Sequence, residues 1–331
     1  MLLPLLGSFL NLKDFSSKYL KSQIQYVFLL ILIALIPCLL KFLVSLTSIV
    51  SQLKSGNPTY PWPPYTDFLK SLVISGVLLV SLSIFKKLFR NASNTLISRK
   101  YKGEDREFRR QKLVDCVFKG SFYVGICSYG YFVVKDCDFF PFALGGRGSS
   151  ANMFNGYPYQ EFDAYENIKL YLTIQLGYHI FSLIQHIFNK AKNDYIDMLL
   201  HHLMTVALVG LAYFMNYVAI SILVLLVHDL SDVFGYLVRI FIDTEYKNFA
   251  VLCYVGLLMS WLYFRLIVLP FEIMRFGIYL NPIIQDLNGY LLLAVMLHCL
   301  IILHVYWYYL FIQMGIKFIK TKSAEDTYHV E

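Results

Sequence analysis

Apolar residues follow one another along this chain in runs long enough to cross a lipid bilayer. A membrane-spanning helix needs about 20 consecutive, mostly apolar residues. The pattern therefore predicts an all-α polytopic membrane protein with about eight transmembrane helices, or seven if one early run lies on the membrane surface. The eight runs occupy residues 24–48, 68–85, 113–134, 169–189, 195–214, 217–238, 249–273 and 287–315.

Composition and charge agree with this pattern. Of the 331 residues, 57% are hydrophobic and only 15% are charged, which is less charge than soluble domains carry. Between the predicted spans, 20 Lys and Arg residues fall on the side of both termini and 5 on the other side. The positive-inside rule then favours cytoplasmic termini. The net charge of +7 reflects this topology, and we expect no nucleic-acid partner.

Ionisable residues interrupt the apolar pattern at LLVHDLSD (225–232). Such groups are costly inside a membrane, so each is a candidate for a functional or paired role. His228, Asp229 and Asp232 are spaced by three and four residues, which predicts that they share one broad face of a helix.

A second cluster lies on the preceding span, where His201 and His202 follow each other. The connection between the two spans, near residues 214–217, is very short, so we expect the spans to be antiparallel neighbours. Both clusters then lie at similar depth near the cytoplasmic side, where they can meet.

These residue types suit acyl transfer. A carboxylate bonded to one imidazole nitrogen makes the other nitrogen a better base or nucleophile. Two alternatives stay open. Histidines and carboxylates also bind metals, although the chain has no HxxxH box, and its six cysteines lack zinc-site spacing. The groups could also only pair with one another and fix the register of the helices.

The stretch from 201 to 241 resembles the Lag1 motif of ceramide synthases, in the TRAM-Lag1-CLN8 (TLC) domain superfamily. Further similarity at residues 171–202, 263–274 and 303–319 extends the resemblance over about 110–319. The matching motif residues are His201, His202, Thr205, Asn216, His228, Asp229, Ser231 and Asp232.

Three positions depart from the family pattern. The family often has Arg where this chain has Ala219, and Glu where it has Tyr236; Arg239 replaces a Lys and keeps the charge. These departures support the alternative of a non-catalytic TLC protein that senses or moves lipid or has a structural role.

The resemblance implies that the last six helices form a TLC-type barrel open to the cytoplasm. It implies a sphingoid-base N-acyltransferase in the endoplasmic reticulum membrane, joining a long-chain base to a fatty acyl-CoA. No metal or further cofactor is expected, and the protein could form homo- or hetero-oligomers. Residues 1–109 would be an N-terminal region with two spans, 110–319 the TLC domain and 320–331 a cytoplasmic tail.

The resemblance also implies roles for individual residues. His201 or His202 would accept the acyl group or act as general base, with His228 as partner, while Asp229 and Asp232 orient them or the amine. Cationic residues at the cytoplasmic mouth would bind the phosphates of CoA. The expected substrate-binding residues are Thr205, Asn216, Ser231, Arg239 and Arg265.

Overall fold

The computed structural model describes residues 63–157, 159–160, 162–188, 195–280 and 290–321, together with a few helical residues between 36 and 47. The chain divides into two compact units, Met1–Gly56 and Asn57–Glu331. The first predicted span, 24–48, lies mostly outside the described residues. Everything below concerns the second unit.

This unit is built from helices, as the runs of apolar residues predict, and its described residues form no β-strand. The seven later predicted spans each coincide with a helix, of which α9 continues into η3 with π-type hydrogen bonding. Within the described residues, α3, α5, α8, the α9–η3 pair and α10 are long and apolar enough to cross a membrane. The protein is thus an all-α polytopic membrane protein. The helices are α3 (Tyr65–Leu88), α4 (Arg90–Leu96), α5 (Gly103–Val134), α6 (Tyr165–Phe188), α7 (Tyr195–Phe214), α8 (Val218–Phe241), α9 (Lys247–Ser260), η3 (Trp261–Tyr279) and α10 (Tyr290–Thr321).

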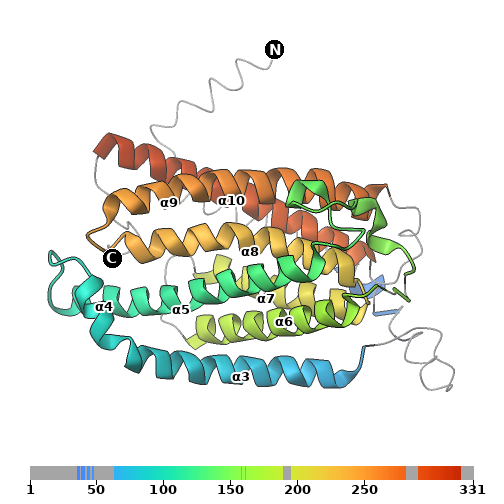
Figure 1. The fold of residues 1–331 in the computed structure, drawn as a ribbon, viewed down its shortest axis with the longest axis horizontal. Coiled ribbons are helices and arrows are strands. Elements are labelled where there is room, and N and C mark those ends of the chain that lie inside the picture. Colours follow the sequence, from blue (N-terminus) through green and yellow to red (C-terminus); the bar gives the residue numbers. More distant parts are fainter. Residues whose placement is uncertain are drawn as a thin grey trace, which may run out of the picture. The chain divides into compact units, whose positions relative to one another are not determined.

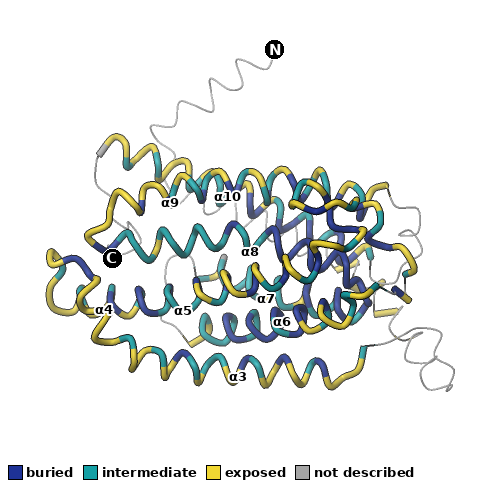
Figure 2. Tube along the Cα trace, in the orientation of Figure 1, coloured by how far each residue is buried: buried dark blue, intermediate teal, exposed yellow. Residues whose placement is uncertain are grey.

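Helix α8 runs through the middle of the unit (Figure 1) and packs against α5, α6, α7, α9 and η3. Its sequence explains this position, because the stretch from Val218 to Val227 is apolar on all sides apart from Ser221. A helix that is apolar all round is buried by its neighbours. Every residue of that stretch is buried, and burial decreases towards Phe241 (Figure 2).

Helix α3 packs tightly on α6, although it lies outside the stretch that resembles the TLC family. The contact is close because Gly177 has no side chain: a Cβ atom there would lie 2.7 Å from the backbone oxygen of Ser71. Ser71 also donates its hydroxyl to the backbone oxygen of Thr173 at 3.0 Å. Small residues permit such backbone approach between membrane helices. The predicted domain boundary at residue 110 stays a prediction.

The connection between α5 and α6 folds over one end of the unit. Its two short 3₁₀ segments, η1 (Phe142–Leu144) and η2 (Ser150–Phe154), follow Phe139 and Phe140, whose side chains are buried in the core. Tyr157 donates its hydroxyl to the backbone oxygen of Met215 at 2.9 Å, which ties this connection to the turn before α8.

An ionic network closes the other end, where α8 is followed by α9. Asp243 is buried and accepts a hydrogen bond from Arg109 of α5 at 2.5 Å. Its backbone oxygen accepts the amide of Ser98 at 3.0 Å. Hydrogen bonds from Ser98 and from the backbone amide of Arg99 lower the pKa of Glu245 below its ordinary value. The basic connection between α4 and α5 is therefore held against the end of α8.

Candidate functional site

The α7–α8 turn is as short as the sequence predicts, and it makes the two helices antiparallel. Asn216 adopts φ = 57°, a left-handed conformation that asparagine tolerates better than most residues. Its side chain accepts a hydrogen bond from Tyr165 at 2.7 Å. His228 lies twelve residues further along, about 18 Å at 1.5 Å per residue. The structure thus places Asn216 in the turn and apart from the histidines.

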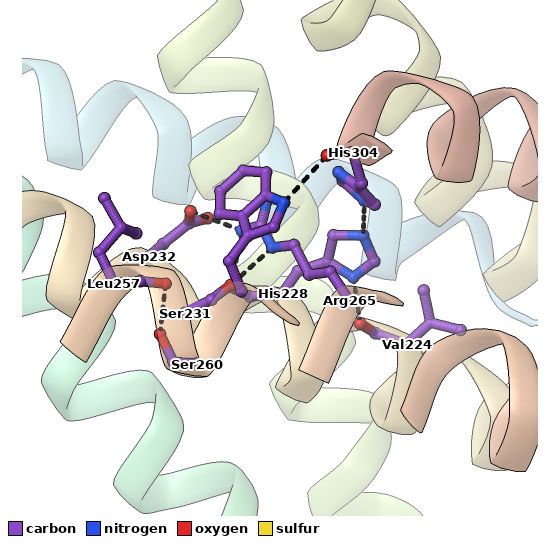
Figure 3. A network of polar contacts seen from close by, with 9 residues as sticks. Val224, His228, Ser231, Asp232, Leu257, Ser260, Arg265 and His304 are labelled. Carbon is purple, nitrogen blue, oxygen red and sulfur yellow. Dashed lines mark hydrogen bonds and ion pairs between the residues drawn. The ribbon is translucent and has the colours of Figure 1, made fainter. Parts of the chain in front are cut away.

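His228 and Asp232 lie one helical turn apart on the face of α8 that meets η3 (Figure 3). Arg265 of η3 reaches across this face. Its guanidinium donates to Asp232 Oδ1 at 2.5 Å, to Ser231 Oγ at 2.5 Å and to the backbone oxygen of His228 at 2.8 Å. It also stacks over the Trp261 ring at 3.8 Å. Arg265 and Ser231, expected to bind substrate, are here partners in an ion-pair network.

Asp229 faces a different helix, which corrects the expectation that the three ionisable residues share one face. One residue turns an α-helix by about 100°, and this rotation directs Asp229 towards α6. Tyr171 donates to Asp229 Oδ2 at 3.1 Å, and Gln175 donates to the same oxygen. All three side chains are buried. Gly130 of α5 makes room for Tyr171, since a Cβ atom there would lie 2.7 Å from its ring.

The two adjacent histidines of α7 have different neighbours. The ring centroid of His201 lies 5.0 Å from that of Trp307 on α10, whereas His202 lies 5.3 Å from His186 on α6. The hydroxyl of Thr205 donates to the backbone oxygen of His201 at 2.8 Å. The hydroxyl of Thr205 is therefore hydrogen-bonded to the backbone of its own helix.

His304 of α10, which was not among the site residues expected from the sequence, connects the two clusters. Its Nε2 lies 2.8 Å from Nε2 of His228 (Figure 3), and its ring centroid lies 6.1 Å from that of Trp307, which also contacts His201. An ionisable residue in an apolar span was the available signal, but nothing in the sequence connects His304 with His228.

The remaining expected residues lie towards the ends of their helices. Arg239 is exposed in the last turn of α8, about 10 Å along the axis from Asp232, and its guanidinium lies 5.6 Å from the Tyr236 ring. Tyr236 stacks on Tyr123 of α5 with centroids 5.2 Å apart, and Ala219 is buried at the start of α8. Both departures from the family pattern are thus accommodated by packing.

Several polar atoms of the site are buried without a hydrogen-bond partner among the described residues: His201 Nδ1, His304 Nδ1, Asp229 Oδ1 and Gln175 Oε1. Each can accept a hydrogen bond, as the imidazole, carboxylate and amide groups all carry lone pairs. The described part of the chain has no group of three or more His, Cys, Asp or Glu side chains arranged to hold a metal ion. What the helices gather is a set of acceptors suited to an amine or another proton donor.

The model of the TLC domain, named TRAM_LAG1_CLN8, matches residues 112–313. The chain belongs to the TLC-domain family. The match begins within α5 and ends within α10, so it includes every helix that carries a residue of the site.

Within this family the chain is similar to ceramide synthases. It is 26% identical to ceramide synthase hyl-2 of Caenorhabditis elegans over 297 residues, covering 82% of this chain and 86% of that protein. It is 31% identical to ceramide synthase LOH2 of Arabidopsis thaliana over 182 residues, 52% of this chain and 61% of that protein. With ceramide synthase 4 of Mus musculus it shares 31% over 179 residues, 51% of this chain and 43% of that protein.

Proposed function

We propose that this TLC-domain protein is a sphingoid-base N-acyltransferase, a ceramide synthase. It would join a long-chain base to a fatty acyl-CoA and form ceramide or dihydroceramide, with release of CoA. The observation that carries the proposal is that α10 bridges the two histidine clusters: Trp307 contacts His201 and His304, and His304 lies against His228. The similarity to named ceramide synthases over most of the chain supports it.

The site contains groups to take a proton from the amine and groups to hold the acyl group. The amine of the base must lose a proton before or as it attacks the acyl carbon, and neutral imidazole nitrogens are suited to accept it. A buried histidine can also hold the acyl group itself, for which His201 and His202 are the candidates. We assign the binding of CoA phosphates to exposed cations at the cytoplasmic end, including Arg239.

Two variants test the proposed activity. In microsomes from cells that lack endogenous ceramide synthase, the wild-type protein should N-acylate sphinganine in the presence of acyl-CoA. His202→Ala and Asp229→Ala should each lower this rate by about two orders of magnitude or more, the range found for general acid–base groups. Equal expression is checked by blotting. Full activity in both variants would remove these residues from the catalytic machinery.

The alternative of a metal site predicts a different response. If the site works without a metal, incubation with a strong chelator should leave the N-acylation rate within about twofold of the untreated rate. Inhibition that is reversed by adding back one divalent metal would support a metal-dependent enzyme. An imidazole whose lone pair binds a metal ion cannot use that lone pair to accept a proton, so the two mechanisms exclude each other at one histidine.

A non-catalytic TLC protein is the second candidate, and the Ala219 and Tyr236 positions favour it. Comparison of ceramide species in cells with and without the protein separates the two. A changed chain-length profile that disappears in the His202→Ala variant supports synthesis. A profile that changes equally with wild type and variant supports the non-catalytic role.

We also propose that the protein lies in the endoplasmic reticulum membrane with both termini in the cytoplasm.

A further inference from the structure

His304 is held in one orientation inside the helix bundle. Its side chain has no exposed surface, and its backbone oxygen accepts a hydrogen bond from the indole nitrogen of Trp261 at 3.1 Å. The ring centroids of Trp261 and Trp307 lie 5.5 Å and 6.1 Å from its own. Because two indole rings pack against it, the imidazole cannot turn away from α8 without displacing a tryptophan.

The hydrogen bonds of His228 determine which nitrogen of His304 carries a proton. His228 Nδ1 lies 2.5 Å from the backbone oxygen of Val224, and a carbonyl oxygen only accepts, so Nδ1 of His228 carries the hydrogen. A neutral imidazole has one N–H and one lone pair, and the lone pair of His228 is therefore on Nε2. The facing Nε2 of His304, at 2.8 Å, must donate. This leaves the lone pair of His304 on its Nδ1.

The other assignments are less favourable. Exchanging both tautomers would direct the lone pair of His228 Nδ1 at the lone pairs of a carbonyl oxygen. Adding a proton to the pair would place a second positive charge close to Arg265, whose guanidinium donates to the backbone oxygen of His228 at 2.8 Å. Like charges at short range in a medium of low dielectric repel strongly. Each ring therefore carries a single proton.

Nδ1 of His304 is a buried acceptor without a partner among the described residues, and Nδ1 of His201 is a second buried ring nitrogen without one. The rings of both residues contact Trp307, so the two nitrogens belong to the same part of the bundle. An unmet buried acceptor costs about 1–3 kcal/mol, and an N–H donor such as an amine removes that cost.

We propose that His304 is a catalytic residue whose Nδ1 accepts the proton of the substrate amine, and that His228 is the positioning residue that fixes its tautomer. This inference rests on the proposed N-acyltransferase function. The amine nitrogen bonds to the carbonyl carbon of the thioester, the C–S bond breaks, and CoA leaves as a thiolate. The proton released from nitrogen passes to His304 Nδ1 as the thiolate forms, so the negative charge of the thiolate offsets the positive charge of the ring; the thiolate then takes the proton, which restores the neutral ring.

Substitution of His304 by Gln separates a base from a structural donor. The Gln amide can still donate to His228 but has no basic nitrogen, whereas Ala removes both functions. Purified variants in lipid nanodiscs are assayed with sphinganine and a panel of long- and very-long-chain acyl-CoAs. His304→Gln should lower kcat by about 100-fold or more with the KM for acyl-CoA within about twofold. His298→Gln, on the same helix and outside the site, is the matched control and should keep wild-type rates.

The outcomes are distinguishable. A His304→Gln rate within about threefold of an active wild type, beside an inactive His304→Ala, overturns the catalytic role and leaves only a structural one. A wild-type protein that acylates no base under any of these conditions overturns the proposed function itself.

The tautomer is tested without turnover, first in the wild-type protein and then in a variant of His228. Solid-state NMR of the ¹⁵N-histidine-labelled wild-type protein should show an Nε2–H···Nε2 coupling between two rings, one of which has a bare Nδ1 that no backbone carbonyl contacts. In His228→Ala the His304 ring should become a mixture of both tautomers. A proton on Nδ1 of His304 in the wild-type protein would contradict the proposal.

Discussion

Arg265 organises the polar face of α8 at the scale of single residues. It is only 2% exposed, and in such surroundings a cation persists when it is paired and hydrogen-bonded. The planar guanidinium supplies several donors in a fixed geometry, which is why one side chain can contact Asp232, Ser231 and the backbone of His228 together. This leaves the His228 imidazole free to bond with His304.

Removing Arg265 alone should destabilise the protein more than removing Arg265 and Asp232 together. Arg265→Gln leaves Asp232 charged and unpaired, and we expect it to lower the free energy of unfolding by about 3 kcal/mol. Adding Asp232→Asn removes the unpaired charge and should recover part of the loss. The measurement is a double-mutant cycle from thermal unfolding in detergent. Arg275→Gln, an exposed cation of the same helix, should change stability little; strict additivity of the two site substitutions would refute the pairing.

Between elements, close approach of helix backbones places the functional side chains. Gly130 lets Tyr171 lie under α5 and reach Asp229, and Gly177 lets α3 pack against α6. Interfaces of this kind depend on small residues because helix association in a membrane gains little from the hydrophobic effect and relies on packing. α3, outside the matched TLC residues, thereby supports the helix that carries Tyr171 and Gln175.

The α3–α6 interface can be tested with a pair of glycine substitutions. Gly177→Ala forces a methyl group to 2.7 Å from a backbone oxygen, and we expect a loss of about 1–3 kcal/mol of stability. Gly125→Ala meets nothing within 4 Å and should be neutral or stabilising by up to about 1 kcal/mol, because alanine favours the helix. Melting temperatures of the two purified variants report the difference. Equal effects of both substitutions would show that the interface is not tight.

Across the whole unit of residues 57–331, α8 is held at both ends while its middle carries the site. At its start, Tyr157 of the connection between α5 and α6 and Tyr165 of α6 donate hydrogen bonds to the turn. At its end, Asp243 pairs with Arg109 and Lys112. With both ends fixed, the rotation of α8 about its axis is set, and so are the directions of His228 and Asp229.

Loss of the Asp243 network should loosen the connection between α4 and α5. Asp243→Ala leaves the half-buried guanidinium of Arg109 without its main partner, and we expect a loss of up to about 3 kcal/mol together with faster trypsin cleavage after Arg99, Lys100 and Lys102. Asp105→Ala removes the other, half-exposed carboxylate that contacts Arg109 and should cost less than about 1 kcal/mol. Cleavage that is equally slow in both variants would show that the network does not hold this connection.

The sequence by itself determined the helices of the second unit, the positions of the polar residues along them and the family. Hydrophobicity is a property of consecutive residues, so the seven apolar runs after residue 56 predicted seven helices, and the His201–His202 and His228–Asp232 motifs were visible as interruptions of those runs. Helix limits moved where polar turns extend a helix beyond the apolar run, as in α5, which begins at Gly103 instead of 113.

Only the tertiary structure decided which groups meet. Asp229 pairs with α6 and Asp232 with η3 because three residues turn a helix by about 300°, which directs the two side chains about 60° apart, and different helices pack on each side. His304 lies 76 residues from His228 along the chain, and no local pattern records that contact. The partner of a buried polar group is set by the packing of helices that are distant in the sequence, so a single sequence does not identify that partner.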